Sequence, residues 1–149
     1  MNESAHPLPH DDVHRLLTGM YDDYLRGDSA AIDALLAEDV TIFDSASEPL
    51  VRGLEELAGL RRKRVSAPAD APSSTWAETA LTIEDLSVRE VGDVVIATWW
   101  LRVDGADTRG VAVSPELSRN TAVLQRRPDG SLRIAHLHED VRQEAHPVV

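Results

Sequence analysis

Two histidines near the end of the chain, His136 and His138, lie in an alternating apolar segment that predicts a β-strand. Side chains two residues apart on a strand share one face, so both imidazoles can approach the same ligand. As a metal pair they lack an obvious third ligand, although Asp140 shares their parity. We therefore expect no metal site here and interpret both histidines as hydrogen-bonding groups.

A second group, Arg61, Arg62, Lys63 and Arg64, gathers four positive charges where a helix is predicted to end. Cations at this position complement the negative end of the helix dipole. A phosphate-binding patch is the alternative, but neither aromatic residues nor a glycine-rich segment accompanies the cluster. We favour the structural interpretation, and the chain has no Ser-His-Asp spacing or glycine-rich phosphate loop.

Length and composition bound the possible functions. The 149 residues fit one domain, and 26 acidic against 15 basic residues give a formal net charge of -11. That charge repels phosphate backbones and argues against a nucleic-acid partner. The absence of cysteine excludes disulfides and thiol nucleophiles, and it fits a cytoplasmic location. No apolar run approaches the ~20 residues of a membrane span, and the polar start does not predict a signal peptide.

The elements that must position any site begin with helices. Apolar residues recur at helical spacing from Val13 to Tyr24, Gly27 ends this helix, and Asp28 caps a short second helix through Leu36. A strand over 40–44, a brief strand over 48–52 and a third helix from Gly53 follow, and 66–75 is a loop. Strands are then predicted over 80–90, 94–103, 119–127 and 132–141, with 111–118 irregular.

This order of helices followed by a strand meander is an α+β layout. Leu81 and Ile83 share one face and Leu86 and Val88 the other, which predicts a β-bulge near Glu84. We expect residues 1–11 to form a flexible arm, 12–142 the domain and 143–149 a tail.

Three motifs in this order of elements resemble the NTF2-like superfamily. Arg26–Asp28 precedes a short helix and a strand that ends in Asp44, and Arg52–Leu57 opens the third helix with a glycine. The third motif, Asp129–Glu139, is similar to the last strand of SnoaL-like domains and of the association domain of calcium/calmodulin-dependent kinases. Leu132 stands where those families usually have tryptophan.

The resemblance implies a cone, in which a curved antiparallel sheet wraps around three N-terminal helices and leaves a pocket open at one end. The outer face of the sheet commonly forms a homodimer in this superfamily. Several strands here are apolar on both faces, which fits one face against the pocket and one against a partner. Trp100 is then expected to wall the pocket, and Trp99 to anchor the dimer.

The resemblance also implies which side chains face the cavity. Asp44 falls where the ketosteroid isomerase branch has its general base, and Tyr24 would orient the substrate beside it. A carboxylate that loses solvation at the rim of an apolar cavity can move a proton beside a carbonyl. The alternative is that Asp44 only caps the following turn. The implied ligand-binding residues are Met20, Ile42, Thr98, Trp100, Arg102, Asn120, Ala122, Leu124, Ala135, Leu137 and Glu139.

Two of these residues, Arg102 and Glu139, are expected to pair across the cavity. Alternatively, Arg102 receives a substrate carboxylate or enolate. The two oxyanion donors of the isomerases fall on Met20 and Ala122, so we do not expect steroid isomerisation.

The resemblance favours a small enzyme or accessory factor that acts on a hydrophobic, polyketide-like or polyene-like intermediate. Such proteins occur in enediyne and other antibiotic biosynthetic clusters. The chemistry would need no cofactor and would resemble that of an acid–base isomerase, cyclase or hydrolase. The alternatives are a non-catalytic ligand carrier and an oligomerisation module, although Ala122 and Glu139 replace two arginines of the kinase association domain.

Overall fold

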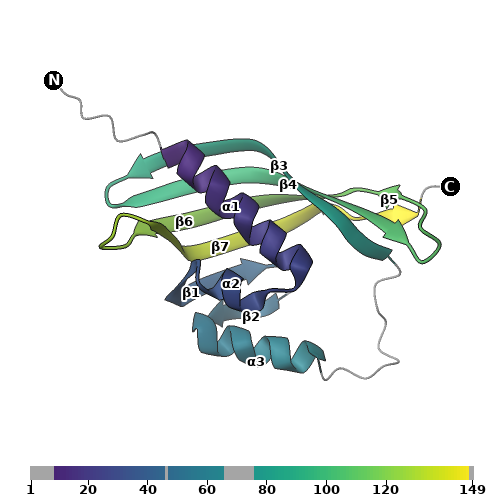
Figure 1. Cartoon of the computed structure of the whole chain (residues 1–149), viewed down its shortest axis with the longest axis horizontal. Coiled ribbons are helices and arrows are strands. Elements are labelled where there is room, and N and C mark those ends of the chain that lie inside the picture. Colours follow the sequence, from purple (N-terminus) through teal and green to yellow (C-terminus); the bar gives the residue numbers. More distant parts are fainter. Residues whose placement is uncertain (1–8, 46, 66–75, 148–149) are drawn as a thin grey trace.

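A curved six-stranded sheet dominates the computed structural model, and helix α1 lies across it (Figure 1). The structure describes residues 9–45, 47–65 and 76–147. Its elements are α1 (Pro9–Arg26), α2 (Ser29–Asp33), β1 (Leu36–Asp44), β2 (Ser47–Arg52), α3 (Gly53–Val65), β3 (Trp76–Val91), β4 (Val94–Asp107), β5 (Val113–Ser114), β6 (Glu116–Arg126), β7 (Leu132–Gln143) and β8 (His146–Pro147).

The strand order of the large sheet is β2-β1-β7-β6-β4-β3, and β5 pairs separately with β8. Neighbouring strands are antiparallel except β1 and β7, which are parallel. Helices first and an antiparallel-rich, unclosed sheet second confirm the predicted α+β NTF2-like fold. The expected antiparallel sheet needs one correction, because the β1–β7 pair joins the first strand to the last in parallel.

The helical part follows the sequence signals closely. Val13, Leu17 and Met20 form the buried stripe of α1, which begins at Pro9, inside the expected arm, because proline suits a first helical turn. The Asp28 carboxylate accepts a hydrogen bond from the Ala31 N–H at 3.1 Å and caps α2. This helix ends before Leu36 because β1 begins there.

The predicted bulge in β3 is confirmed. Its pairing with β4 shifts between Glu84 and Ser87, and Asp85 takes a positive φ of 55°. The shift lets Leu81, Ile83, Leu86 and Val88 all pack against the same core. A second bulge, which the sequence did not predict, lies in β7 between Ile134 and His136.

The termini and the long connection fall partly outside this description. The predicted loop over 66–75 and residues 1–8 of the expected arm lie outside the described residues. The segment after 142, expected as a tail, contributes the end of β7 and strand β8. The segment 111–118, expected to be irregular, contains β5 and the start of β6.

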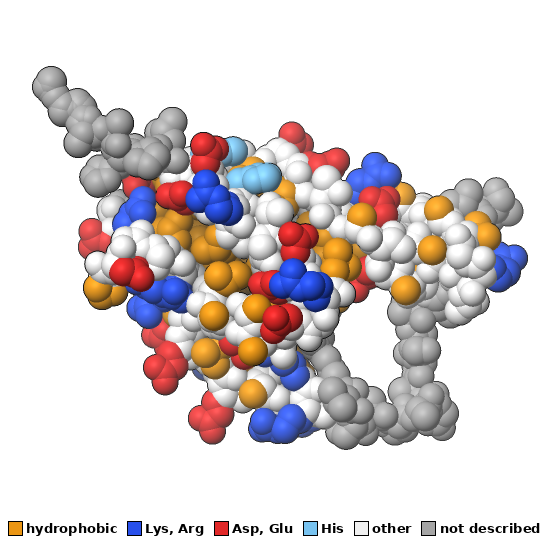
Figure 2. Space-filling model, viewed as in Figure 1, with side chains coloured by type: hydrophobic (Ala, Val, Ile, Leu, Met, Phe, Trp, Pro, Cys, Tyr) orange, Lys and Arg blue, Asp and Glu red, His pale blue; other side chains and the backbone are white. Residues whose placement is uncertain are grey.

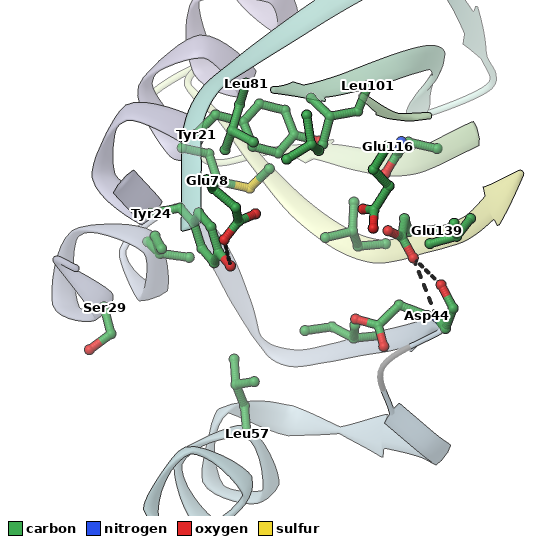
Figure 3. Close-up of a pocket in the computed structure, with 18 of the residues that line it drawn as sticks. Tyr21, Tyr24, Ser29, Asp44, Leu57, Glu78, Leu81, Leu101, Glu116 and Glu139 are labelled. Carbon is green, nitrogen blue, oxygen red and sulfur yellow. Dashed lines mark hydrogen bonds between the residues drawn. The ribbon is translucent and has the colours of Figure 1, made fainter. Parts of the chain in front are cut away.

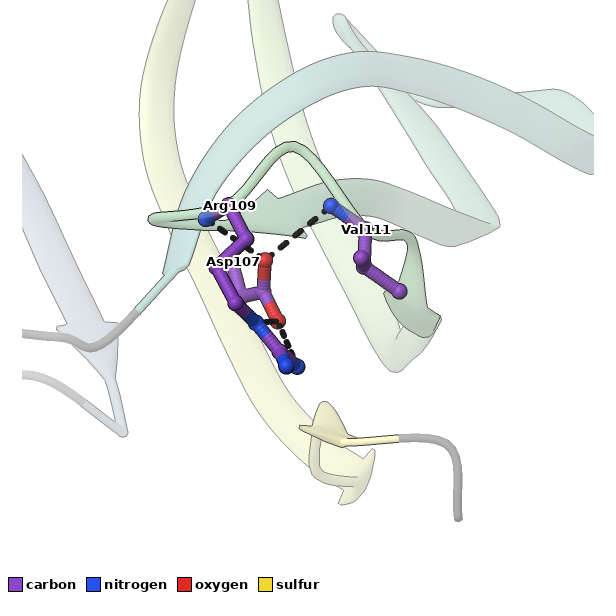
Figure 4. A network of polar contacts seen from close by, with 3 residues as sticks. All are labelled: Asp107, Arg109 and Val111. Atoms are coloured by element: carbon purple, nitrogen blue, oxygen red, sulfur yellow. Dashed lines mark hydrogen bonds and ion pairs between the residues drawn. The ribbon is translucent and has the colours of Figure 1, made fainter.

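The turn between β4 and β5 is fixed by one carboxylate (Figure 4). Asp107 accepts hydrogen bonds from the N–H groups of Arg109 at 2.8 Å and Val111 at 3.0 Å, and its second oxygen pairs with the Arg109 guanidinium. The Arg109 side chain, followed by these backbone donors, holds the pKa of Asp107 below its ordinary value.

Acidic and basic side chains alternate over the face that carries α1, with apolar side chains between them (Figure 2). Within the described residues, no helix has both the length and the apolar character that a membrane crossing requires.

Candidate functional site

A cavity of about 890 Å³ lies between the three helices and the curved sheet (Figure 3). Sites for small organic ligands commonly enclose about 300–1,000 Å³. Apolar side chains from helices and strands form most of its wall, as such ligands require. They are Met20, Ile32, Leu36, Ile42, Val51, Leu57, Leu60, Leu81, Leu101, Val103, Leu137 and Val141.

Asp44 lies at the end of β1, half-buried, and lines this cavity (Figure 3). The parallel pairing of β1 with β7 places it beside Glu139. Ser45 links the two strands, because its hydroxyl and its N–H donate to Oε1 of Glu139 at 2.5 and 3.3 Å. The site therefore contains a pair of neighbouring carboxylates instead of a single acid.

Three further glutamates complete what we call the acidic wall, defined as Asp44, Glu78, Glu116, Glu139 and Glu144. All five residues line the cavity, and they come from β1, β3, β6, β7 and the segment after β7. Burial, together with the charges of Glu139, Glu78 and Glu144, raises the pKa of Glu116.

Sequence reasoning missed Glu78, Glu116 and Glu144 as site residues. The alternation of side chains along β6 could have identified Glu116. Glu116 lies two residues before Ser118 and four before Asn120, so all three side chains lie on the inner face of the strand. Glu78 could not be found from alternation, because the pairing of β3 with β4 shifts between Glu78 and Ala80. The regular alternation of inward and outward side chains that includes Leu81 does not extend across this shift.

A second part of the cavity wall, which we call the inner end, is formed by Met20, Tyr21 and Leu101, with Trp99 behind them. Trp99 is 2% exposed, and its indole N–H donates to the Tyr21 hydroxyl at 3.0 Å. Burial raises the pKa of Tyr21, against a smaller lowering by the Trp99 bond. This tyrosine therefore keeps its proton at neutral pH and can donate a hydrogen bond.

Tyr24 lies one helical turn further along α1 and also lines the cavity. Its side chain is 51% exposed, and its hydroxyl donates to Oε1 of Glu78 at 2.8 Å (Figure 3). The ring of Tyr24 is thus part of the wall, and its proton is directed to a carboxylate in the ligand-free protein.

The structure reverses the expected face of β4. Trp99, Leu101 and Val103 point inward and are buried, whereas Thr98, Trp100 and Arg102 lie on the outer face. These last three residues do not line the cavity, because a shift of one residue exchanges the two faces of a strand. The inward face of β4 could not be chosen from the sequence alone, because both faces of this strand carry apolar side chains.

Two other expectations need the same kind of correction. Arg102 pairs with Asp104 at 3.2 Å, so the expected Arg102–Glu139 ion pair does not form. Ala135 does not line the cavity because the β7 bulge falls at this point, after which Leu137 and Glu139 face inward.

The remaining expected residues lie on the inner side of the sheet or on α1. Asn120 is 5% exposed, lines the cavity, and donates from its amide to Oγ of Ser118 at 3.0 Å. Ala122 and Leu124 are fully buried in the core and do not reach the cavity. The expected residues that do line it are Met20, Tyr24, Ile42, Asp44, Asn120, Leu137 and Glu139.

Comparison with known protein families identifies the family of this domain. Residues 13–141 match the model of the SnoaL-like domain. The chain belongs to this family. A sequence search of the curated proteins finds no match. SnoaL-like and ketosteroid isomerase-like domains bind small molecules, and many are polyketide-related enzymes.

Solved structures similar to this SnoaL-like domain are distant in sequence. ActVI-ORFA from Streptomyces coelicolor superposes with a TM-score of 0.70 at 17% identity, over 89% of this chain and 96% of that chain. A ketosteroid isomerase-like protein from Erwinia carotovora atroseptica gives 0.68 at 16% identity, over 93% and 99%. The CaMKII hub of S. rosetta gives 0.67 at 18% identity, over 89% and 96%.

The outer face of this SnoaL-like domain carries the two histidines. Nδ1 of His136 lies 2.6 Å from Oγ1 of Thr41, and the His138 ring lies 6.1 Å from the ring of Phe43. Within residues 9–45, 47–65 and 76–147, no three or more His, Cys, Asp or Glu side chains are grouped to hold a metal ion.

The cationic group at the end of α3 has a structural contact. Arg61 lines the cavity. Its guanidinium pairs with Asp33 of α2 at 2.7 Å and so joins α3 to α2 in this SnoaL-like domain. The side chain of Arg64 lies outside the described residues.

Proposed function

We propose that this protein binds a small hydrophobic, carbonyl-bearing molecule in the cavity and moves a proton on it. The observation that carries the proposal is a carboxylate, Asp44, in the wall of a cavity that combines apolar side chains with the protonated hydroxyl of Tyr21. A base and a hydrogen-bond donor in one cavity are the groups that enolisation requires.

In the proposed step, Asp44 removes a proton from the carbon next to the substrate carbonyl. Tyr21 donates a hydrogen bond to the carbonyl oxygen, on which negative charge develops. Return of the proton from Asp44 to another carbon completes an isomerisation, and no atom or electron is gained or lost. The Trp99 indole, which donates to the Tyr21 oxygen, orients the hydroxyl so that its proton is left for the substrate.

Tyr24 is the second candidate for the donor role. Its hydroxyl donates to Glu78 in the ligand-free protein, so it would have to exchange this partner for the substrate. We therefore assign the donor role to Tyr21 and a substrate-orienting role to Tyr24. We propose as the substrate class a polyketide-like or polyene-like intermediate of antibiotic biosynthesis, such as enediyne formation. The frequent polyketide-related enzymes of the family support the polyketide part of this proposal.

The proposal is tested by proton exchange on a model ketone. With 2-tetralone in deuterated buffer, we expect the protein to accelerate deuterium uptake next to the carbonyl, followed by mass spectrometry. Asp44→Asn is expected to lower the rate by about 10²–10⁴-fold, the usual contribution of a general base, while 2-tetralone still binds. An Asp44→Asn rate equal to that of the parent would contradict the catalytic role and favour a carrier.

A homodimer through the outer face of the sheet is the second part of the proposal. Phe43 of β1 is 51% exposed there, and Ile96 and Trp100 of β4 and Val123 of β6 lie half-buried on the same face. The similarity to CaMKII hubs supports an interaction role for this scaffold. Sedimentation of the parent and of a Phe43→Glu/Trp100→Glu double variant tests it, because only the parent is expected to sediment as a dimer.

A further inference from the structure

The acidic wall places five carboxylates around one cavity. Among the described residues that line the cavity, Arg61 is the one Lys or Arg, and it is held by Asp33 at 2.7 Å. The charges of Glu139, Glu78 and Glu144 act on Glu116 and help to raise its pKa, and a cation between such like charges relieves their repulsion. A neutral ligand would leave that repulsion unchanged.

Asn120 supplies an independent observation, because it is buried and carries no charge. Its amide group donates to Oγ and to the carbonyl oxygen of Ser118, at 3.0 and 3.4 Å. That assignment leaves its Oδ1 as an acceptor with no partner among the described residues, in the wall of the cavity. Oδ1 is not among the buried atoms that lack a partner, so it is reached from the cavity and is available to a donor on a ligand.

The carboxylates next to Asn120 have unused acceptors as well. Asn120 and Glu139 are direct partners on β6 and β7, and Ser45 donates both of its bonds to Oε1 of Glu139, leaving Oε2 unbonded within the described chain. Glu116, four residues before Asn120, receives no hydrogen bond from any residue that the structure describes. The ligand group that fits here carries several donors and a positive charge, as an ammonium does.

Aromatic rings lie beside another member of the acidic wall. Tyr24 contacts Glu78 through its hydroxyl, and Trp76, two residues from Glu78 on β3, also lines the cavity. Trp76 lies against Gly105, where an added Cβ would come within 2.2 Å of its ring. Cations bind favourably over such rings.

We propose that the cavity selects an apolar molecule bearing a protonated amine, with the ammonium against Glu116, Glu139 and Oδ1 of Asn120. The apolar body then lies along Met20, Leu101 and Leu137. This inference rests on the proposed small-molecule function and narrows its substrate class. An organic cation fits better than a metal ion, because the described residues contain no group arranged to hold a metal.

The test compares three probes of one shape by titration calorimetry at pH 7.5: 4-phenylbutylamine, 4-phenylbutanol and 4-phenylbutyrate. We expect the amine to bind at least about tenfold more tightly than the alcohol, the gain that one charge-assisted hydrogen bond supplies. The butyrate should bind more weakly than the alcohol, because its carboxylate meets the acidic wall.

Two variants and a matched control locate the effect. Glu116→Gln and Glu139→Gln are expected to lower amine affinity by about five- to tenfold and to leave alcohol affinity unchanged. Glu84→Gln removes the same charge from an exposed residue of β3 outside the cavity and should change neither affinity.

The outcomes separate this inference from the function on which it rests. Equal affinities for the amine and the alcohol, or equal losses in Glu84→Gln and Glu139→Gln, would overturn the cation preference and leave the small-molecule cavity intact. Binding of none of the three probes would overturn both.

Discussion

The inner end of the cavity and the acidic wall are built in opposite ways. At the inner end the polar groups are buried and matched, as where the Trp99 indole N–H meets the Tyr21 hydroxyl. Along the acidic wall, Glu116 and one oxygen of Glu139 receive no hydrogen bond from the described residues. Matched polar groups stabilise a fold, whereas crowded carboxylates destabilise it. The inner end therefore contributes to folding, and our proposal of ligand binding explains why the acidic wall is present.

The largest effect on stability is expected from a substitution at the inner end of the cavity. Trp99→Ala removes a 2% exposed ring from the core and leaves the Tyr21 hydroxyl without its donor. We expect a loss of about 3–5 kcal/mol in the free energy of unfolding, measured by urea denaturation. The control is Trp100→Ala on the outer face, and an equal loss in both variants would contradict the inward placement of Trp99.

Trp99 also shows which part of the fold could not be predicted from the sequence. The buried stripe of α1, the Asp28 cap and the bulge near Glu84 all follow from local patterns, because helix periodicity and strand alternation are properties of neighbouring residues. The face of β4 does not follow, since Trp99 and Trp100 are equally apolar and only a register formed with distant strands decides between them.

The same limit applies to the site. Asp44 could be proposed because the resemblance places it where the ketosteroid isomerase branch has its general base. Glu139 could be predicted in the same way, but Glu78 and Glu116 come from two other strands and reach the cavity only after the sheet has curved. Two bulges, in β3 near Glu78 and in β7 near Ala135, shift the inward parity, and one of them moves Ala135 away from the cavity.

A smaller, stabilising effect is expected at the acidic wall. Glu116→Gln removes a carboxylate whose pKa is raised by burial and by Glu139, Glu78 and Glu144. Relief of a partly exposed like-charge contact yields at most about 1 kcal/mol, which corresponds to about 2–4 °C in Tm for a chain of this length. We expect Tm at pH 8 to rise by no more than this amount.

The sign of the pH dependence follows from the raised pKa of Glu116. The folded protein binds this proton more tightly than the unfolded chain, so the contribution to stability is present at low pH and is lost as the pH rises through the raised value. The gain of Glu116→Gln should therefore be seen at pH 8 and vanish at pH 4. A gain of the same size at both values would show that the charge of Glu116 is not its cause.

The smallest effect is expected outside the cavity. Arg102 is exposed and pairs with Asp104, and exposed pairs contribute about 0–1 kcal/mol. Arg102→Ala should change the free energy of unfolding by less than about 1 kcal/mol and leave 4-phenylbutylamine binding unchanged in calorimetry. A marked change in binding would restore this arginine to the site.

The parallel pairing of β1 with β7 has a consequence for synthesis of the chain. Thr41 and His136, which this pairing brings together, are 95 residues apart. During translation β1 cannot pair with β7 until nearly the whole sequence has emerged. Until then one edge of β1 and its apolar side are uncovered, and such edges promote aggregation. Asp44 acquires its neighbour Glu139 at the same late step. A nascent chain that stops before β7 therefore lacks both its protected edge and its paired carboxylates.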